Sequence, residues 1–161
     1  MILVFNASPL IVLAKAGLLD QFCSLGEPSM MPQTVVDEIL RVDDPEDRAR
    51  VWIENRGGPM HVIPTLPLPP FLAGWDLGAG ESAVISSVVS HPGSVAVLDD
   101  LAARRCALAH GIQMTGTLGL VLLAKKRGMI AEVGSVLDAI VAAGLYISAK
   151  HLAEVRAKAR E

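Results

Sequence analysis

Short apolar runs alternate with amphipathic segments along this chain of 161 residues. Residues 1–5 form a continuous apolar run, which is typical of a strand that is buried on both faces, and residues 94–98 predict a second buried strand. Shorter strands are expected at residues 29–31, 61–63 and 112–114. Helical patterns lie between and after the strands, at residues 8–16, 18–25, from 34 onward, 43–55, 79–89, 102–109, 118–126, 131–143 and 149–159.

Two of these predicted helices carry start signals. Ser8 is a good cap and Pro9 suits the first helical position, so we expect the first helix to begin there. Thr34 and Asp37 have the spacing of a capping-box pair for a later helix. Residues 64–75 contain four prolines and predict an extended loop.

Strands that alternate with helices predict a parallel sheet with helices on both faces, that is, an α/β fold. We expect a single domain over residues 1–161, with residues 131–161 as a C-terminal helical extension. In such sheets, ligands bind beyond the carboxyl ends of the strands. Asn6 and Asp99 each follow a predicted strand, so their side chains are expected at the same edge.

Four distant segments each bring a compact polar or acidic residue to the end of an apolar run. They contribute Asn6, Glu38, Glu81 and the pair Asp99–Asp100. Carboxylates that share a site repel one another unless a cation neutralises them, so the cluster predicts a divalent-metal site. Each residue alone has a structural alternative: Asp100 can cap the next helix, and Glu81 suits a helix N-terminus.

The composition limits the class of protein. Hydrophobic residues make up 52% and aromatic residues only 4%, so the core must consist of aliphatic side chains. Cys23 and Cys106 lie in apolar helical patterns without metal-ligand spacing, and we expect both to be buried free thiols. No signal peptide and no run of about 20 apolar residues is apparent, which predicts a cytoplasmic protein without a membrane span.

Charge is distributed unevenly. Residues 1–99 carry 12 acids and 5 Lys or Arg, whereas residues 100–161 carry 5 acids and 9 Lys or Arg. This pattern is either a set of solvated helix faces or an acidic pocket beside a basic surface for a phosphate backbone. The cations suited to RNA are Lys15, Arg104, Arg105, Lys125, Lys126 and Arg127. No aromatic platform for stacking bases is visible.

Five motifs together resemble those of PIN domains, and in particular a branch grouped with the toxins of VapBC toxin–antitoxin pairs. They are residues 6–10 (NASPL), 36–39 (VDEI), 80–85 (GESAVI), 98–100 (LDD), and 111–119 (GIQMTGTLG) together with 125–128 (KKRG). The resemblance covers nearly the whole chain.

The resemblance implies a three-layer α/β/α sandwich, a Mg²⁺ or Mn²⁺ site and cleavage of RNA by a metal-activated water. Asn6, Glu38, Glu81 and Asp99 would occupy the metal-pocket positions, with Asp100 as an alternative fourth member and the carboxylates as catalytic groups. Ser8 would hydrogen-bond a ligand carboxylate or water. Thr115 and Thr117 would donate to a phosphate or a water, unless Thr117 is simply a helix cap. A small antitoxin protein and a homodimer are also implied.

Asn6 departs from the family pattern, because PIN nucleases ordinarily have Asp there. An amide oxygen can bind a hard cation, but it adds no negative charge and cannot act as a base. The Asn6 amide can also donate to a neighbouring carboxylate and close the pocket without metal. The chain is therefore either a ribonuclease toxin or a catalytically impaired PIN-like module that binds RNA or protein. A nucleotide-binding domain is disfavoured, since no glycine-rich phosphate loop is present.

Overall fold

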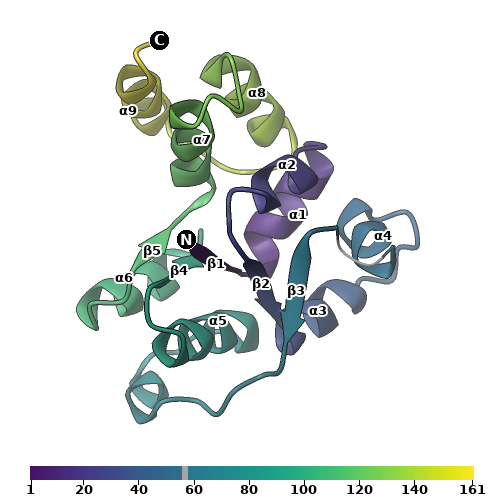
Figure 1. Ribbon diagram of the computed structural model, residues 1–161, viewed down its shortest axis with the longest axis vertical. Helices are drawn as coiled ribbons and strands as arrows, with labels where there is room; N and C mark the ends of the chain where they lie inside the picture. Colours follow the sequence, from purple (N-terminus) through teal and green to yellow (C-terminus); the bar gives the residue numbers. More distant parts are fainter. Residues whose placement is uncertain (56–57) are drawn as a thin grey trace.

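A five-stranded parallel sheet forms the centre of the molecule (Figure 1). The computed structural model describes residues 1–55 and 58–161. In spatial order the strands are β3 (Met60–Ile63), β2 (Ser29–Pro32), β1 (Ile2–Phe5), β4 (Ser94–Val97) and β5 (Met114–Thr115). The central strand β1 is the most apolar because both of its faces are covered, and Leu3, Val4 and Phe5 are fully buried.

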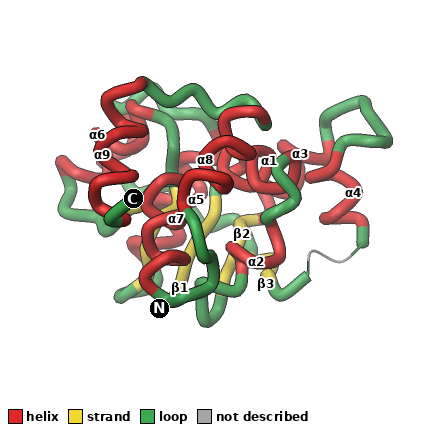
Figure 2. Tube along the Cα trace, turned by 90° about the horizontal axis from the view of Figure 1, so that it is seen from above, coloured by secondary structure: helices red, strands yellow, loops and turns green. Residues whose placement is uncertain are grey.

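The connections between strands place the helices in two layers. The chain moves outward in one direction from β1 through β2 to β3, and then crosses back to β4 and β5 on the other side of β1. Because right-handed crossovers in opposite directions leave on opposite faces, the helices between β1 and β3 cover one face of the sheet and those between β3 and β5 cover the other. The strands accordingly lie in the interior with helices around them (Figure 2). This is the predicted three-layer α/β/α fold.

Helices α1 to α4 belong to the first layer, while the one-turn 3-10 helix η1, α5 and α6 follow β3 and β4. Three further helices, α7 to α9, follow β5; α8 packs on α7 and α1, and α9 packs beside α7 and α8. The bounds are α1 Ala7–Lys15, α2 Leu19–Cys23, α3 Gln33–Leu40, α4 Arg48–Glu54, η1 Pro70–Gly74, α5 Ala79–Ser90, α6 Leu101–Ala109, α7 Thr117–Lys126, α8 Val133–Ala142 and α9 Ala149–Ala159.

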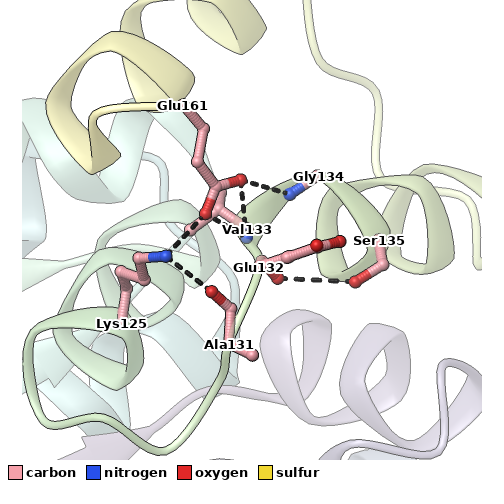
Figure 3. Close-up of polar contacts among 7 residues, drawn as sticks. All are labelled: Lys125, Ala131, Glu132, Val133, Gly134, Ser135 and Glu161. Atoms are coloured by element: carbon pink, nitrogen blue, oxygen red, sulfur yellow. Dashed lines mark hydrogen bonds and ion pairs between the residues drawn. The ribbon is translucent and has the colours of Figure 1, made fainter.

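A single carboxylate fastens the end of α9 to the start of α8 (Figure 3). The Glu161 side chain accepts hydrogen bonds from the backbone N–H groups of Val133 at 2.9 Å and Gly134 at 3.1 Å, and from Lys125 Nζ at 2.7 Å. The hydrogen bonds from Lys125 and from the α8 backbone lower the pKa of Glu161 to about 2. The carboxylate therefore joins α7, α8 and α9 and satisfies N–H groups that the helix itself leaves without a partner.

Each predicted strand and helix overlaps an element of the structure, but the strand expected at residues 112–114 begins only at Met114, and several start signals were wrong. The first helix begins at Ala7, not at a Ser8 cap, because the Asn6 N–H still bonds to the β4 carbonyl of Val97 and the helix starts directly after it. The capping box at Thr34 is absent, since its hydroxyl pairs with Thr65 and the helix already starts at Gln33.

Two other predicted segments differ in extent. The helix expected at residues 43–55 begins only at Arg48, because the Asp47 carboxylate accepts hydrogen bonds from the Ala49 and Arg50 N–H groups and caps the helix there. The proline-rich loop at residues 64–75 contains the short helix η1. These differences shift boundaries and leave the topology unchanged.

The cysteines follow the prediction. Cys23 and Cys106 are buried free thiols. Burial, helped by the nearby Asp20 carboxylate, raises the pKa of Cys23 to about 12. None of the helices in residues 1–55 and 58–161 combines the length and the apolar character needed to cross a bilayer.

Candidate active site

The order in which the chain forms the strands reverses at β1: β2 and β3 lie on one side of it, and β4 and β5 lie on the other. In parallel α/β sheets, ligands bind at such a reversal point, which here lies between β1 and β4. Asn6 follows β1 and Asp99 lies two residues after β4, so both stand at the carboxyl edge of the sheet. Glu38 comes to the same edge from α3 and Glu81 from the first turn of α5, two helices that pack against each other. The fold therefore brings the predicted pocket residues to one edge.

Asn6 is the most constrained of these residues. It occupies the N-cap position of α1, yet its side chain does not cap that helix. Instead, with only 1% of the residue exposed, Nδ2 donates a hydrogen bond to Glu81 Oε1 at 2.9 Å. Asn6 Oδ1 is buried and has no hydrogen-bond partner among the described residues. A buried acceptor without a partner is costly and points to a ligand at this position.

Gly80 makes room for the oxygen atoms of this pocket. A Cβ atom at residue 80 would lie 2.8 Å from Asn6 Oδ1 and would collide with Glu38 Oε2. The amide oxygen and a Glu38 carboxylate oxygen thus both border the same small space, which exists because residue 80 has no side chain. Burial, and secondarily the Glu81 carboxylate, raises the pKa of Glu38, whereas Arg41 lowers it.

Asp99 is held separately, by the residue that begins α7. The Thr117 N–H donates to Asp99 Oδ1 at 2.8 Å, and the Thr117 hydroxyl donates to Asp99 Oδ2 at 2.5 Å. Thr117 is fully buried, so both bonds are sheltered from water. Gly116 permits this approach, because a Cβ there would lie 2.8 Å from Asp99 Oδ1 and 2.9 Å from Arg104 Nη1. The Asp99 carboxylate is therefore fixed in orientation.

The remaining predicted pocket residues have less direct positions. Asp100 caps α6 by accepting a hydrogen bond from the Ala103 N–H at 2.8 Å, the alternative foreseen for it. Ser8 is exposed on α1. The Thr115 hydroxyl lies 3.4 Å from the Gly116 carbonyl oxygen, to which it donates. Thr117 contacts a carboxylate, as described above, and the N-cap of α7 is Gly116 rather than Thr117. Catalytic roles for these side chains stay predictions.

The donor set fits a hard divalent cation only when the amide is included. Within residues 1–55 and 58–161, no three His, Cys, Asp or Glu side chains are grouped so that they could hold a metal ion. Asn6 Oδ1 supplies an additional oxygen donor beside the Glu38 and Glu81 carboxylates, and all three are the oxygen ligands that Mg²⁺ and Mn²⁺ accept. Asn6, Glu38 and Glu81 are thus the residues that would hold the metal, with Asp99 on the neighbouring strand end.

Two of the predicted RNA-binding cations make contacts within the fold. Lys125 pairs with Glu161, and Arg127 donates to the Leu25 carbonyl oxygen at 2.7 Å. Lys15 lies at the end of α1, and its carbonyl oxygen accepts a hydrogen bond from Arg48.

Two cations lie on the helix that follows Asp99. Arg104 donates to the Leu98 carbonyl oxygen at 3.0 Å and borders the Asp99 pocket, while Arg105 is exposed on α6. Lys126 is exposed and lines a hollow with Lys158 and Arg160, two cations that the sequence did not single out.

A groove beside Asp99 contains residues that sequence reasoning missed. Its volume is about 510 Å³, and Tyr146 and His151 line one wall of it. Tyr146 is 92% exposed, and it is the single tyrosine of the chain. One feature of the sequence could have identified Tyr146. It lies in a short segment between two predicted helices, directly after Gly144 and Leu145, where a large aromatic residue has no helix face to pack against.

Comparison with known proteins agrees with the motifs. A family model described as PIN domain matches residues 2–161. A search of curated proteins finds no match. Since the model covers nearly the full length and the sheet and helices follow the expected arrangement, this chain belongs to the PIN domain family, a nuclease superfamily.

Proposed function

We propose that this protein is a metal-dependent endoribonuclease and the toxin of a type II toxin–antitoxin pair. The observation that carries the proposal is the buried Asn6 Oδ1, which has no partner among the described residues and shares the space beside Gly80 with a Glu38 oxygen. PIN domains generally depend on a divalent metal, and this pair of oxygens is suited to one. A cytoplasmic location belongs to the same proposal.

The residues of the pocket have distinct tasks in this proposal. When bound, a divalent cation supplies positive charge that offsets the charge of the phosphate and makes water beside it more acidic. Glu81 is oriented by the Asn6 amide, and Asp99 by Thr117, so both carboxylates hold fixed positions. Glu38 shares the space beside Gly80 with Asn6 Oδ1, so its carboxylate would hold the cation together with the amide oxygen.

One observation favours a second candidate function, a PIN-like module that binds RNA or protein without cleaving it. The Asn6 Nδ2 bond to Glu81 Oε1 neutralises part of the repulsion in the pocket without any metal. A pocket that is stable when empty binds a cation less strongly than one that requires it. The two candidates therefore differ in metal affinity and in cleavage, and both properties can be measured.

The test compares two neighbouring acids on α3. Both residues are exposed, but Glu38→Gln removes a carboxylate that borders the pocket, whereas Asp37→Asn removes one that instead accepts a hydrogen bond from Gln33 Nε2. With single-stranded RNA and Mg²⁺ or Mn²⁺, we expect Glu38→Gln to slow cleavage about 100-fold or more and Asp37→Asn to cleave like the wild type. Calorimetric titration with Mn²⁺, without RNA, should show weakened binding in Glu38→Gln alone.

The possible outcomes separate the candidates. Equal cleavage by wild type and Glu38→Gln would mean that the pocket does not carry the activity. Binding of RNA by the wild type without cleavage at any tested metal concentration would favour the binding module. A partner antitoxin and a homodimer belong to the same proposal, and co-expression with the product of a short neighbouring gene would test the first of them.

A further inference from the structure

The groove beside Asp99 is lined by residues from several elements. Asp99 and Gly116 lie at the edge of the sheet, Arg104 lies on α6, Tyr146 lies in the segment between α8 and α9, and His151 lies in the first turn of α9. The volume of about 510 Å³ lies within the range of sites that bind small ligands and single nucleotides. It also adjoins the carboxylate edge of the sheet, so a ligand in the groove would extend from the candidate active site.

Tyr146 gives this groove an unusual surface. The residue is 92% exposed, and Leu101, which also lines the groove, is 60% exposed. A tyrosine ring left in water forgoes a large area of apolar burial, which a flat ring placed on it would recover. The ring therefore offers a stacking surface within the groove.

Positive charge continues from this groove along the seam between α7 and α9, which lie side by side (Figure 1). His151 and Lys158 are two helical turns apart on α9, about 10 Å, and so share one face of the helix. Lys158 lines the next hollow along the seam together with Lys126 and Arg160. Glu154 lies between His151 and Lys158 on that face, so the cations of the seam are concentrated at its Lys158 end.

We propose that this path binds single-stranded RNA, with one base stacked on the Tyr146 ring and the phosphates of its neighbours near Arg104 and near the Lys126–Lys158 cluster. The inference rests on the proposed function, because the strand bound along this path is the RNA substrate whose scissile bond would enter the acidic pocket. An aromatic ring set between cationic patches is the arrangement by which proteins bind single strands, the ring taking a base and the cations the backbone. Charge complementarity thus favours a polyanion over an apolar or basic peptide, and the exposed Tyr146 ring favours a polyanion that carries bases to stack, namely RNA, over an acidic peptide.

The experiment measures RNA binding without cleavage. A fluorescent single-stranded RNA is titrated in EDTA and its anisotropy is recorded for wild type, Tyr146→Ala, Tyr146→Phe and a matched control, Leu108→Ala. Leu108 is 73% exposed on α6 and does not line the groove. We expect Tyr146→Ala to weaken binding about ten-fold, while Tyr146→Phe and Leu108→Ala stay within about two-fold of wild type.

Two further readouts distinguish stacking from a general loss of structure. A 2-aminopurine base in the RNA should lose fluorescence when wild type or Tyr146→Phe binds, and retain it with Tyr146→Ala at saturating protein. Lys126→Ala should weaken binding and reduce the dependence of affinity on salt by about one counterion, with quenching preserved. Circular dichroism checks that each variant remains folded.

The inference and the proposed function fail in different ways. If Tyr146→Ala binds and quenches as the wild type does, the stacking site is refuted, whereas the cleavage defect of Glu38→Gln is unaffected. If the wild type does not cleave but its binding depends on Tyr146, the stacking site stands and the ribonuclease proposal is refuted. If the wild type binds no RNA in EDTA, or if binding depends equally on Leu108, the groove is not an RNA path.

Discussion

Replacing Asn6 by aspartate restores the residue ordinarily found at this position of PIN nucleases, and the structure predicts a cost for it. In the wild type, Asn6 Nδ2 donates to Glu81 Oε1 over 2.9 Å. Asn6→Asp exchanges this donor for a second carboxylate at nearly the same place. The variant therefore loses a hydrogen bond to a charged group and gains a like-charge contact inside a buried pocket.

The size of the effect can be worked out from that distance. Two unit charges 2.9 Å apart repel by about 6 kcal/mol at an effective dielectric constant of about 20. If the two side chains rotate to twice that separation, the repulsion falls to about 3 kcal/mol. The lost charged hydrogen bond adds about 1.5–3 kcal/mol. We expect Asn6→Asp to lower the free energy of unfolding by about 4.5–6 kcal/mol at pH 7 without metal.

Urea denaturation in EDTA measures this loss, with Asn55→Asp as the matched control. Asn55 is exposed at the end of α4, so the same amide-to-acid change there should alter the free energy of unfolding by no more than about 0.5 kcal/mol. Adding Mn²⁺ to Asn6→Asp should recover stability, by about 2.7 kcal/mol when the metal is at 100 times its dissociation constant. The wild type should gain less from the same concentration.

The pH dependence has a definite sign. Close carboxylates have raised pKa values in the folded state, so their ionisation costs stability above those pKa values and the cost disappears as the pH falls. The deficit of Asn6→Asp should therefore shrink on acidification from pH 7. An Asn6→Asp protein that is as stable as Asn55→Asp in EDTA, and that gains nothing from Mn²⁺, would refute the contact between Asn6 and Glu81 as the feature that stabilises the pocket.

Four further predictions follow from individual contacts. Gly80→Ala should lower the thermal stability although alanine favours a helix, because the added Cβ would collide with Glu38 and with the buried, hydrogen-bonded side chain of Asn6, and it should weaken Mn²⁺ binding more than ten-fold in calorimetry. Thr117→Val should destabilise the protein by about 1–3 kcal/mol in urea and slow cleavage, whereas Thr117→Ser should retain both properties, because the hydroxyl bond to Asp99 is kept. Glu161→Gln should lower the melting temperature at pH 7. The difference from wild type should vanish as the pH falls from about 4.5 to about 2, because the folded state lowers the pKa of the Glu161 carboxyl and its stabilising contribution is lost when it is protonated. Cys23, with its pKa raised to about 12, should resist iodoacetamide at pH 8 in the folded protein and react readily in urea, and rapid labelling of the native protein would contradict its burial.

The sequence predicted the sheet and its functional edge because those signals are local. The apolar run before Asn6 and the one before Asp99 each identify a buried strand, and the rule for parallel sheets then brings both residues to one edge. Helix α9 was predicted with its observed bounds, Ala149–Ala159, because its apolar spacing is unbroken. Asp100 acts as the cap that its position allows.

The features that the sequence did not predict depend on contacts between distant residues. The Thr34 hydroxyl has a partner 31 residues away in Thr65, which no local pattern indicates. The stacking of His110 on Phe71, at 4.1 Å between ring centroids, fixes the proline-rich loop to the end of α6 by a contact of the same kind. Tyr146 was missed because an exposed ring in a loop has no periodicity, and its interest arises only from the groove that Asp99 shares with it.

The amide at residue 6 explains how the acidic pocket can fold before any cation binds. With aspartate, the edge of the sheet would bring another negative charge beside Glu81, and folding would depend on metal; the Asn6 amide instead donates to Glu81 and leaves its own oxygen open beside Gly80. Asparagine in place of aspartate also removes one negative charge that would attract the cation, so this pocket must bind the cation more weakly than a site with aspartate does. An activity that uses this pocket should accordingly follow the concentration of free divalent metal over a wide range, rather than saturate at a trace amount. Metal dependence of the cleavage rate is therefore the property by which the amide form of the pocket is best distinguished from the aspartate form.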